Sequence, residues 1–167
     1  MFYAHRRSLM HRDFDSAMKM FDHALTQWPG SAMTWAWSSY TWAYVGEGKE
    51  AVRRARKAIE LSPRDREEHH FQSALCVSHY LAGDYDEAVA AGFRAIENPA
   101  CIHATYRWTA GALAATGKLV EAHDMMQLAM ERLPGQGVSH VMRISPIRDA
   151  KRREAYGAHL LASGFPP

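Results

Sequence analysis

Residues 83–95 read GDYDEAVAAGFRA, a short turn followed by Ala88 and, seven positions later, Ala95. The chain carries this arrangement four times. The leading alanines are spaced 34, 37 and 34 residues apart: Ala17, Ala51, Ala88 and Ala122. A period of about 34 residues with helix–turn–helix content is typical of stacked helical hairpins. The sequence therefore predicts an all-α solenoid without strands.

Turn and boundary residues follow the same period. Three of the turns contain a glycine that suits a positive φ angle, namely Gly46, Gly83 and Gly117. A proline comes near the end of each copy: Pro29, Pro63, Pro99 and Pro134. Three helix starts are also predicted, each with a capping side chain before a proline at the first helical position. These pairs are Ser62-Pro63, Asn98-Pro99 and Ser145-Pro146.

The second copy, residues 32–65, resembles the tetratricopeptide repeat, whose pattern is Trp-x2-Leu-Gly-x2-Tyr followed by Ala, Phe, Ala and Pro. Trp35 takes the tryptophan position and Trp42 the tyrosine position. Ser38-Ser39 replaces Leu-Gly, and Ala55 replaces the phenylalanine. Small residues still let the two helices approach closely. The resemblance implies a right-handed α-solenoid whose first helices line a concave groove and whose second helices form the convex side.

This pattern divides one continuous solenoid domain into four parts. We expect a partial first hairpin over 1–31, three hairpins over 32–134, a linker over 135–145, and a capping helix with a tail over 146–167. Nine helices follow from this division. The last helix is expected to cover the apolar end of the fourth hairpin, as an open stack requires. Its apolar residues for this role are Ile147, Tyr156, Leu160 and Leu161, and the residues expected to face water are Arg148, Lys151, Arg152 and Arg153.

The tail resembles a narrower group of proteins. Residues 144–149 read ISPIRD, and Arg153, Tyr156, Leu160 and the segment 164–166 follow. This is similar to the ending of bacterial class III adenylate/guanylate cyclases and related regulators that carry tetratricopeptide repeats. The resemblance implies a regulatory or docking segment in bacterial signalling. The alternating strand pattern of a cyclase domain does not occur here. The incomplete first repeat fits a fragment of a larger protein or a short stand-alone one.

Composition gives no support for several classes of protein, namely nucleic-acid binders, membrane proteins and disulfide-rich proteins. The formal net charge is +2, from 20 basic and 18 acidic residues, which gives no indication of a nucleic-acid or membrane partner. Two cysteines are too few for a disulfide framework. No stretch approaches the roughly 20 apolar residues of a membrane span. We therefore expect a cytoplasmic protein.

Candidate catalytic and metal-binding patterns are weak. Glu67 and His70 have the Glu-x-x-His spacing of di-iron bundles, but the second such pair is missing. Cys76 takes a small-residue position, which favours an inert buried thiol. The basic run formed by Arg53, Arg54, Arg56 and Lys57 is interpreted as a solvated face, with a docking strip for an acidic partner as the alternative. We expect no catalytic residue, no cofactor and no metal.

Mapping the repeats onto the resembled fold predicts a partner-binding groove on the first helices. Tyrosine and arginine are residue types that anchor partner chains. Tyr44 and Tyr80 have an alternative role, packing between hairpins, and Trp35, Trp37 and Trp42 are assigned to the core. The predicted groove residues are Phe2, Arg6, Met33, Tyr40, Tyr44, His70, Ser73, Tyr80 and Arg107.

These observations predict a non-catalytic protein-interaction module that binds a peptide or a partner domain in its groove. The alternative is a small-ligand-sensing regulatory domain that uses the groove or a pocket between repeats. An enzymatic role would need a catalytic pair or a metal that the sequence does not supply. A homodimer through the incomplete N-terminal repeat is a further expectation, because that repeat leaves an apolar end that a second copy would cover.

Overall fold

The structure is a computed structural model that describes the backbone of residues 2–167 and the side chains of residues 3–167. Within that range the chain is helical, without strands. The elements are α1 (Phe2–Arg6), the π-helical η1 (Arg7–His11), α2 (Phe14–Gln27), α3 (Ala32–Val45), α4 (Gly48–Leu61), α5 (Glu68–Ala82), α6 (Tyr85–Ile96), α7 (Ala104–Ala115), α8 (Leu119–Arg132), α9 (Val138–Ile144) and α10 (Ala150–Ala162).

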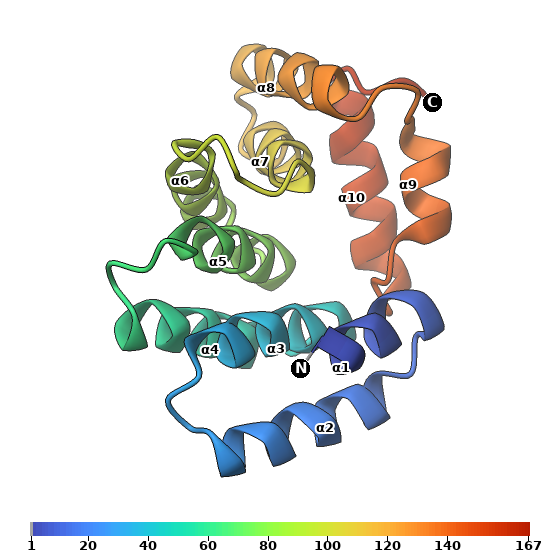
Figure 1. Cartoon of the computed structure of the whole chain (residues 1–167). Helices are drawn as coiled ribbons and strands as arrows, with labels where there is room; N and C mark the ends of the chain where they lie inside the picture. Colours follow the sequence, from blue (N-terminus) through green and yellow to red (C-terminus); the bar gives the residue numbers. More distant parts are fainter. Residues whose placement is uncertain (1) are drawn as a thin grey trace.

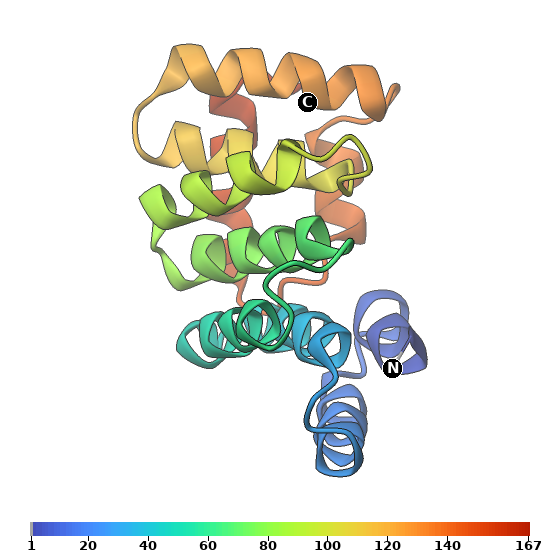
Figure 2. The same cartoon turned by 60° about the vertical axis from the view of Figure 1, so that its left-hand side comes forward.

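The helices pair in chain order into hairpins that stack on one another (Figures 1 and 2). The first hairpin consists of α1 and η1 with α2, and the next three are α3–α4, α5–α6 and α7–α8. A fifth hairpin, α9–α10, lies beside this stack (Figure 1). The predicted all-α solenoid is confirmed.

Small residues explain the close packing of the second helices. The four leading alanines of the repeat have no exposed surface. Gly48, at the start of α4, lies so near α5 that a Cβ added there would be 2.7 Å from the Cα of Ala82. Larger side chains at these points would force the hairpins apart, because protein interiors contain little free volume.

The tight turns agree with the sequence, and the predicted helix starts do not. Gly46, Gly83 and Gly117 have φ angles of 100°, 93° and 79°. However, α5, α7 and α10 begin four or more residues after the proline pairs. The short polar side chains close local turns instead: Asp65 Oδ2 accepts from the Ser62 hydroxyl at 2.7 Å, and Asn98 Oδ1 accepts from the Ala100 N–H at 2.9 Å. Such local bonds compete with helix formation.

The C-terminal part differs from the expected linker and cap. Residues 138–144 form the helix α9, so residues 2–167 contain ten α-helices and not nine. The last helix begins at Ala150, where the Asp149 side chain accepts a hydrogen bond from the Arg152 N–H at 2.8 Å. This is an N-cap of the ordinary kind.

Arg54 also departs from its predicted place on a solvated face. It is 7 % exposed, and its guanidinium lies 3.5 Å from the centre of the Trp42 ring. Glu50 and Asp22 accept hydrogen bonds from it at 2.8 and 2.7 Å. These partners replace the water that a buried charge loses. Arg54 therefore joins α2, α3 and α4, and is not free for an acidic partner.

Candidate functional site

The α9–α10 hairpin lies across the first helices of the repeats, where a free concave groove was expected (Figure 1). The Arg148 N–H donates to the Tyr44 carbonyl at 2.9 Å, and the Arg152 guanidinium donates to the Gly46 carbonyl at 2.9 Å. Arg12 reaches the Arg143 and Ser145 carbonyls at 3.2 Å. The hairpin is thus fastened to the first and second repeats as well as to α7.

This position corrects the expectation that the last helix covers the end of the fourth hairpin. Ile147, Tyr156 and Leu160 are buried as predicted, but Tyr156 packs on Trp108 of α7, and Leu161 is 50 % exposed. The outermost helix, α8, keeps Leu119 and Val120 exposed. The helix α10 therefore packs on α7 and on Tyr80 of α5, and it leaves part of the end of the stack uncovered.

Four rings pack together under α10, and we call them the packed cluster: Tyr80, Trp108, Tyr156 and His159. Tyr156 stacks on Trp108 with ring centres 4.0 Å apart and planes 8° from parallel. Tyr80 meets both rings edge-on, with centres 5.1 and 5.3 Å away. The Tyr80 hydroxyl lies 2.7 Å from Nδ1 of His159. Burial lowers the pKa of His159, so the neutral ring accepts this hydrogen bond at neutral pH.

A cavity of about 310 Å³ lies between this cluster and the N-terminal helix, and we call it the chamber. Aromatic and aliphatic side chains dominate its wall, and within the described chain none of its lining residues is acidic. The lining residues come from α1, η1, α3, α5, α7, α9, α10 and the segments next to them: His5, Leu9, Trp37, Tyr40, Tyr44, Val77, Ile102, Ala104, Thr105, Arg107, Trp108, Val141, Ile144, Ser145, Pro146 and Tyr156.

On the N-terminal side of the chamber the His5 ring lies 4.2 Å from Trp37 and 5.6 Å from Tyr40, whereas the three rings of α3 lie further from one another. The Trp37 and Tyr40 centres are 6.0 Å apart, and the Tyr40 and Tyr44 centres 6.3 Å. Within residues 3–167 neither tyrosine hydroxyl has a hydrogen-bond partner, and the same holds for Nδ1 of His5 and Oγ of Ser145. The wall therefore combines apolar area with two unpartnered tyrosine hydroxyls, while His5 Nδ1 and Ser145 Oγ have almost no accessible surface.

The titratable groups of this wall are mostly uncharged. Burial lowers the pKa of His5 to about 4, so its ring is neutral at pH 7. Burial raises the pKa of the Tyr40 and Tyr44 hydroxyls, which stay protonated. Each of these shifts has the same cause, since loss of water disfavours the charged form of any group.

Arg107 supplies the positive charge of the chamber. Its side chain donates to the Tyr156 hydroxyl and to Oε1 of Gln136, both at 3.2 Å. Among the described residues no carboxylate lies within 4 Å of it. A half-buried guanidinium without a counter-ion favours an anion at this place.

The predicted groove residues separate into those that meet at the chamber and those that do not. Tyr40, Tyr44 and Arg107 line it together. Tyr80 is buried under α10 in the packed cluster. It therefore follows the alternative role given above, in which it packs and does not line the groove. Ser73 packs between α5 and α7, where its Oγ accepts from the Thr105 hydroxyl at 2.8 Å.

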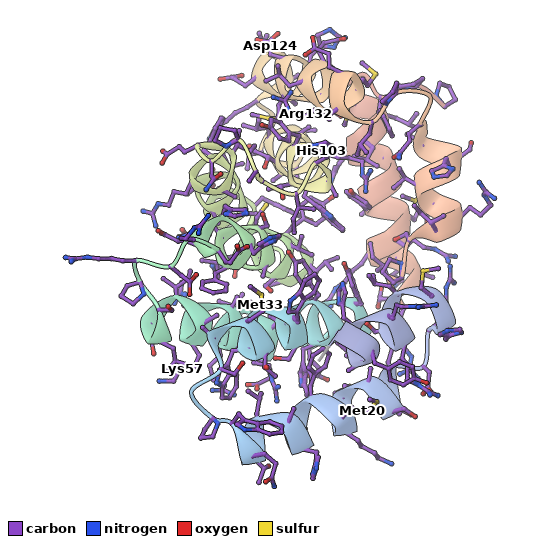
Figure 3. All side chains as sticks on the ribbon, viewed as in Figure 1. Met20, Met33, Lys57, His103, Asp124 and Arg132 are labelled. Atoms are coloured by element: carbon purple, nitrogen blue, oxygen red, sulfur yellow. The ribbon has the colours of Figure 1, made fainter. Side chains whose placement is uncertain are left out.

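The remaining predicted residues lie elsewhere. Met33 lies between α3 and α5, partly buried against the core (Figure 3). Arg6 is exposed on α1, and His70 lies beside Trp37 with ring centres 6.4 Å apart. The Phe2 side chain lies outside the described residues. Partner binding by any of these residues stays a prediction.

Sequence reasoning missed His5 and Trp37 as chamber residues. Trp37, Tyr40 and Tyr44 are spaced three and four positions apart, which places them on one face of α3, so this signal was present. Trp37 was assigned to the core, and it is half-buried at the chamber. His5 precedes the first complete repeat, so no pattern indicated where it would lie.

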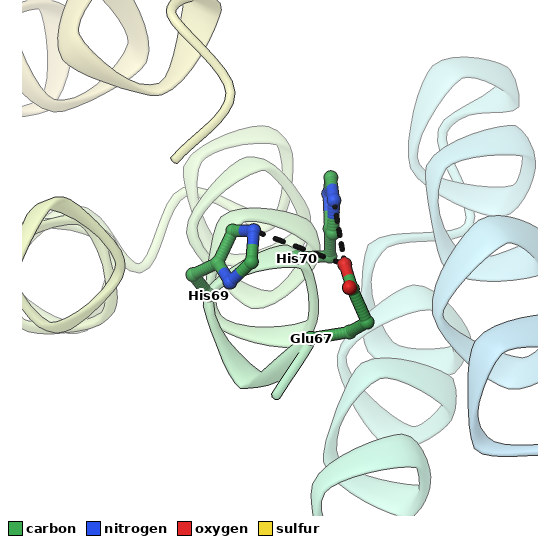
Figure 4. A group of neighbouring side chains, drawn as sticks. All are labelled: Glu67, His69 and His70. Carbon is green, nitrogen blue, oxygen red and sulfur yellow. Dashed lines mark ion pairs between the residues drawn. The ribbon is translucent and has the colours of Figure 1, made fainter. Parts of the chain in front are cut away.

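Glu67, His69 and His70 come together at the start of α5 (Figure 4). Glu67 Oε2 lies 3.0 Å from Nε2 of His70 and 3.9 Å from Nε2 of His69, while His69 Nδ1 lies 3.2 Å from the Arg66 carbonyl. Their three ligand atoms lie within 4.8 Å of one another. They are one fewer than the four ligands of a structural zinc site. The expected absence of a metal stays a prediction.

The two cysteines are buried, as predicted for Cys76. Burial raises the pKa of Cys76 to about 12, which keeps the thiol protonated and poorly nucleophilic. No helix of residues 2–167 has the length and apolar character to cross a membrane.

Comparison with known proteins bears on the fold. No protein-family model and no curated protein matches the chain. Among solved structures, the crystal structure of MamA is similar, with a TM-score of 0.64 over 95 % of this chain and 91 % of that one. The fold is that of a tetratricopeptide-repeat solenoid. The two sequences are 17 % identical, so the tetratricopeptide-repeat likeness concerns the fold and not the partner.

Proposed function

We propose that this chain is a non-catalytic protein-interaction module. The observation that carries the proposal is the concave face of the solenoid, which already holds the α9–α10 hairpin through aromatic contacts and backbone hydrogen bonds. A surface that accommodates a helix of its own chain has the shape and chemistry to accommodate a partner segment. The solenoid architecture, in which side chains are used mainly for stacking, supports a binding role over a catalytic one.

The uncovered part of the groove lies beside α1 and the chamber, and we propose that a peptide or a partner domain binds there. Arg6 is exposed at this place, and Ile144 is 50 % exposed at the chamber wall. The Arg6 side chain makes no hydrogen bond or ion pair with the described residues. A partner that needed the region of Tyr80 would first have to displace α10.

Site-specific photo-crosslinking in the source cells tests this proposal. A crosslinking amino acid at Arg6 should capture a defined protein, and one at Lys49, which is exposed on α4, should not. In the Arg6-labelled protein, the added change Tyr40→Ala should weaken capture. Equal capture from both positions, or none from Arg6, would remove the support for a groove partner.

We further propose that the module is a regulatory segment of bacterial signalling, on the basis of the tail resemblance to cyclase-type proteins. An immunoblot of the source cells with an antibody to this chain tests it. A band well above 18.9 kDa would support a larger parent protein. A band at 18.9 kDa would oppose that model and favour a free-standing adaptor.

A second candidate is a small-ligand-sensing regulatory domain, and the chamber is the observation that favours it. Its wall is shared by the first, second, third and fourth repeats and by the C-terminal hairpin. A ligand bound there would hold the hairpin to the repeats, because it would contact both. Ligand binding to the folded state raises its stability by an amount that grows with the logarithm of the ligand concentration once that concentration exceeds the Kd. A thermal-shift screen of metabolites should then give reproducible stabilisation by one chemical class.

A further inference from the structure

The chamber has the properties of a ligand site of a particular chemistry. Its volume of about 310 Å³ is at the lower end of the range of about 300–1,000 Å³ that small-molecule pockets occupy. A molecule with one or two rings fits this space. Larger cofactors, such as dinucleotides, do not.

The side chains of the wall indicate the shape of the apolar part of the ligand. Trp37, Tyr40 and Tyr44 present rings from one face of α3, and Trp108 presents another from α7. Aromatic side chains bind flat rings by offset stacking or by edge-to-face contacts. Val77 and Val141 add aliphatic surface, and both are buried. A planar aromatic body therefore fits better than a flexible sugar.

The charge of the wall indicates which charged group the ligand carries. Arg107 lacks a carboxylate partner among the described residues, and His5 is neutral, so the chamber carries one positive charge. One guanidinium matches one carboxylate through two parallel hydrogen bonds. A phosphate with nearly two negative charges would require further cations, and the chamber wall provides none.

We propose that the chamber binds a small planar aromatic carboxylate, with its ring among Trp37, Tyr40 and Trp108 and its carboxylate on Arg107. The Tyr40 and Tyr44 hydroxyls have no hydrogen-bond partner within the described residues, so they are available for a further polar substituent on the ligand. The inference rests on the ligand-sensing candidate and does not depend on a protein partner.

Isothermal titration calorimetry of the full chain with 2-naphthoate tests the proposal, with 2-naphthamide as the uncharged analogue of equal shape. A ligand of this size that fits its site binds with a Kd of about 1 mM or tighter. We expect 2-naphthoate to bind in that range and 2-naphthamide to bind at least about tenfold more weakly, because it lacks the charge that Arg107 attracts. Equal affinities would overturn the carboxylate assignment.

Two variants locate the binding. Ala104 lines the chamber, so Ala104→Leu fills it without removing a contact and should abolish binding. Ala158→Leu makes the same change at an exposed position of α10 and should leave the Kd unchanged. Arg107→Gln should weaken 2-naphthoate at least about tenfold and leave 2-naphthamide nearly unaffected. Circular dichroism of each variant confirms that it is folded.

The outcomes separate this inference from the protein-interaction proposal. Failure of 2-naphthoate, benzoate and indole-3-acetate to bind at about 10 mM would overturn the ligand class, since a fitting ligand would be mostly bound there. Binding that persists in Ala104→Leu would place the ligand outside the chamber and would also overturn it. In either case a partner crosslinked at Arg6 would still support the interaction module.

Discussion

The concave face holds two groups of aromatic residues that are alike in composition and different in packing. In the packed cluster the Tyr156 and Trp108 rings stack 4.0 Å apart, and the tyrosine hydroxyls have partners. In the chamber the Tyr40 and Tyr44 rings lie 6.3 Å apart, and their hydroxyls have none within residues 3–167. The same residue types thus fasten the fold at one end and surround free space at the other.

This difference follows from the path of the C-terminal hairpin. The helix α10 packs directly on α7 (Figure 1), and its Tyr156 and His159 rings contact Tyr80 of α5. Beside α3, only Ser145, Pro146 and parts of α9 and α10 reach the aromatic row. The C-terminal hairpin therefore decides which of the aromatic residues on the first helices are packed and which line the chamber.

The largest effect is expected from Tyr156→Ala in the packed cluster. Tyr156 is 1 % exposed, so its removal leaves a cavity between α10 and α7 and breaks the stack on Trp108. Truncation of large buried aromatic residues costs about 3–5 kcal/mol. Urea unfolding measures this loss, and Tyr3→Ala, at a residue 60 % exposed, should change stability by less than about 0.5 kcal/mol. A cost below about 1 kcal/mol for Tyr156→Ala would contradict the packed arrangement.

The second-largest expected effect is a loss of folding stability at acidic pH, caused by His5 at the chamber. Burial lowers the pKa of His5 from 6.5 to about 4, so the unfolded chain binds this proton more readily than the folded one. Stability is therefore fully present above pH 6.5 and falls as the pH decreases toward 4. The shift corresponds to at most about 3 kcal/mol. Unfolding free energies between pH 7 and pH 4 should fall less steeply in His5→Gln than in the wild type.

An exposed histidine provides the control for this measurement. His103→Gln replaces a residue on the surface and serves as the control variant. Identical slopes for the wild type and His5→Gln would show that His5 is not buried as neutral imidazole. The packed cluster contributes in the same direction through His159, whose pKa burial also lowers.

A matched pair of hydroxyl deletions compares the two groups directly. Tyr80→Phe removes the 2.7 Å hydrogen bond to His159, and we expect a loss of about 1 kcal/mol. Tyr40→Phe removes a hydroxyl without a protein partner in the described chain, so the loss should be below about 0.5 kcal/mol. Chemical denaturation of both variants measures the two values. Equal losses would mean that the chamber hydroxyl is engaged as fully as the clustered one.

Much of the fold was predictable because it depends on local rules. The spacing of the alanines requires hairpins of similar length, and Gly46, Gly83 and Gly117 mark turns that need positive φ angles. The helix α9 was not predictable, since its seven residues are too few to show helical periodicity. The amphipathic pattern of α10 indicated its apolar face, but such a pattern does not specify which surface that face covers.

The candidate site was predictable to the extent that it lies inside the repeats. Tyr40, Tyr44 and Arg107 follow from placing first helices on the concave side, and they do meet at one cavity. The contributions of His5 and Ser145 depend on contacts between the two ends of the chain. These contacts join residues more than a hundred positions apart, such as Arg12 and Ser145, and no local pattern reports them.

The smallest expected change in stability is a gain and not a loss. Its sign therefore tests the comparison of the two regions most sharply. Ser145 is 4 % exposed and its Oγ has no partner within the described residues. Ser145→Ala removes a buried polar group whose desolvation is uncompensated, so we expect stability to stay constant or to rise by up to about 0.5 kcal/mol. Ser163 is fully buried, and its hydroxyl donates to the Leu160 carbonyl at 2.7 Å, so Ser163→Ala should cost about 1 kcal/mol. Thermal and urea unfolding of the two variants give the signs. If Ser145→Ala were as costly as Ser163→Ala, the Ser145 hydroxyl would be hydrogen-bonded in the folded protein, and this difference between the two regions would not hold.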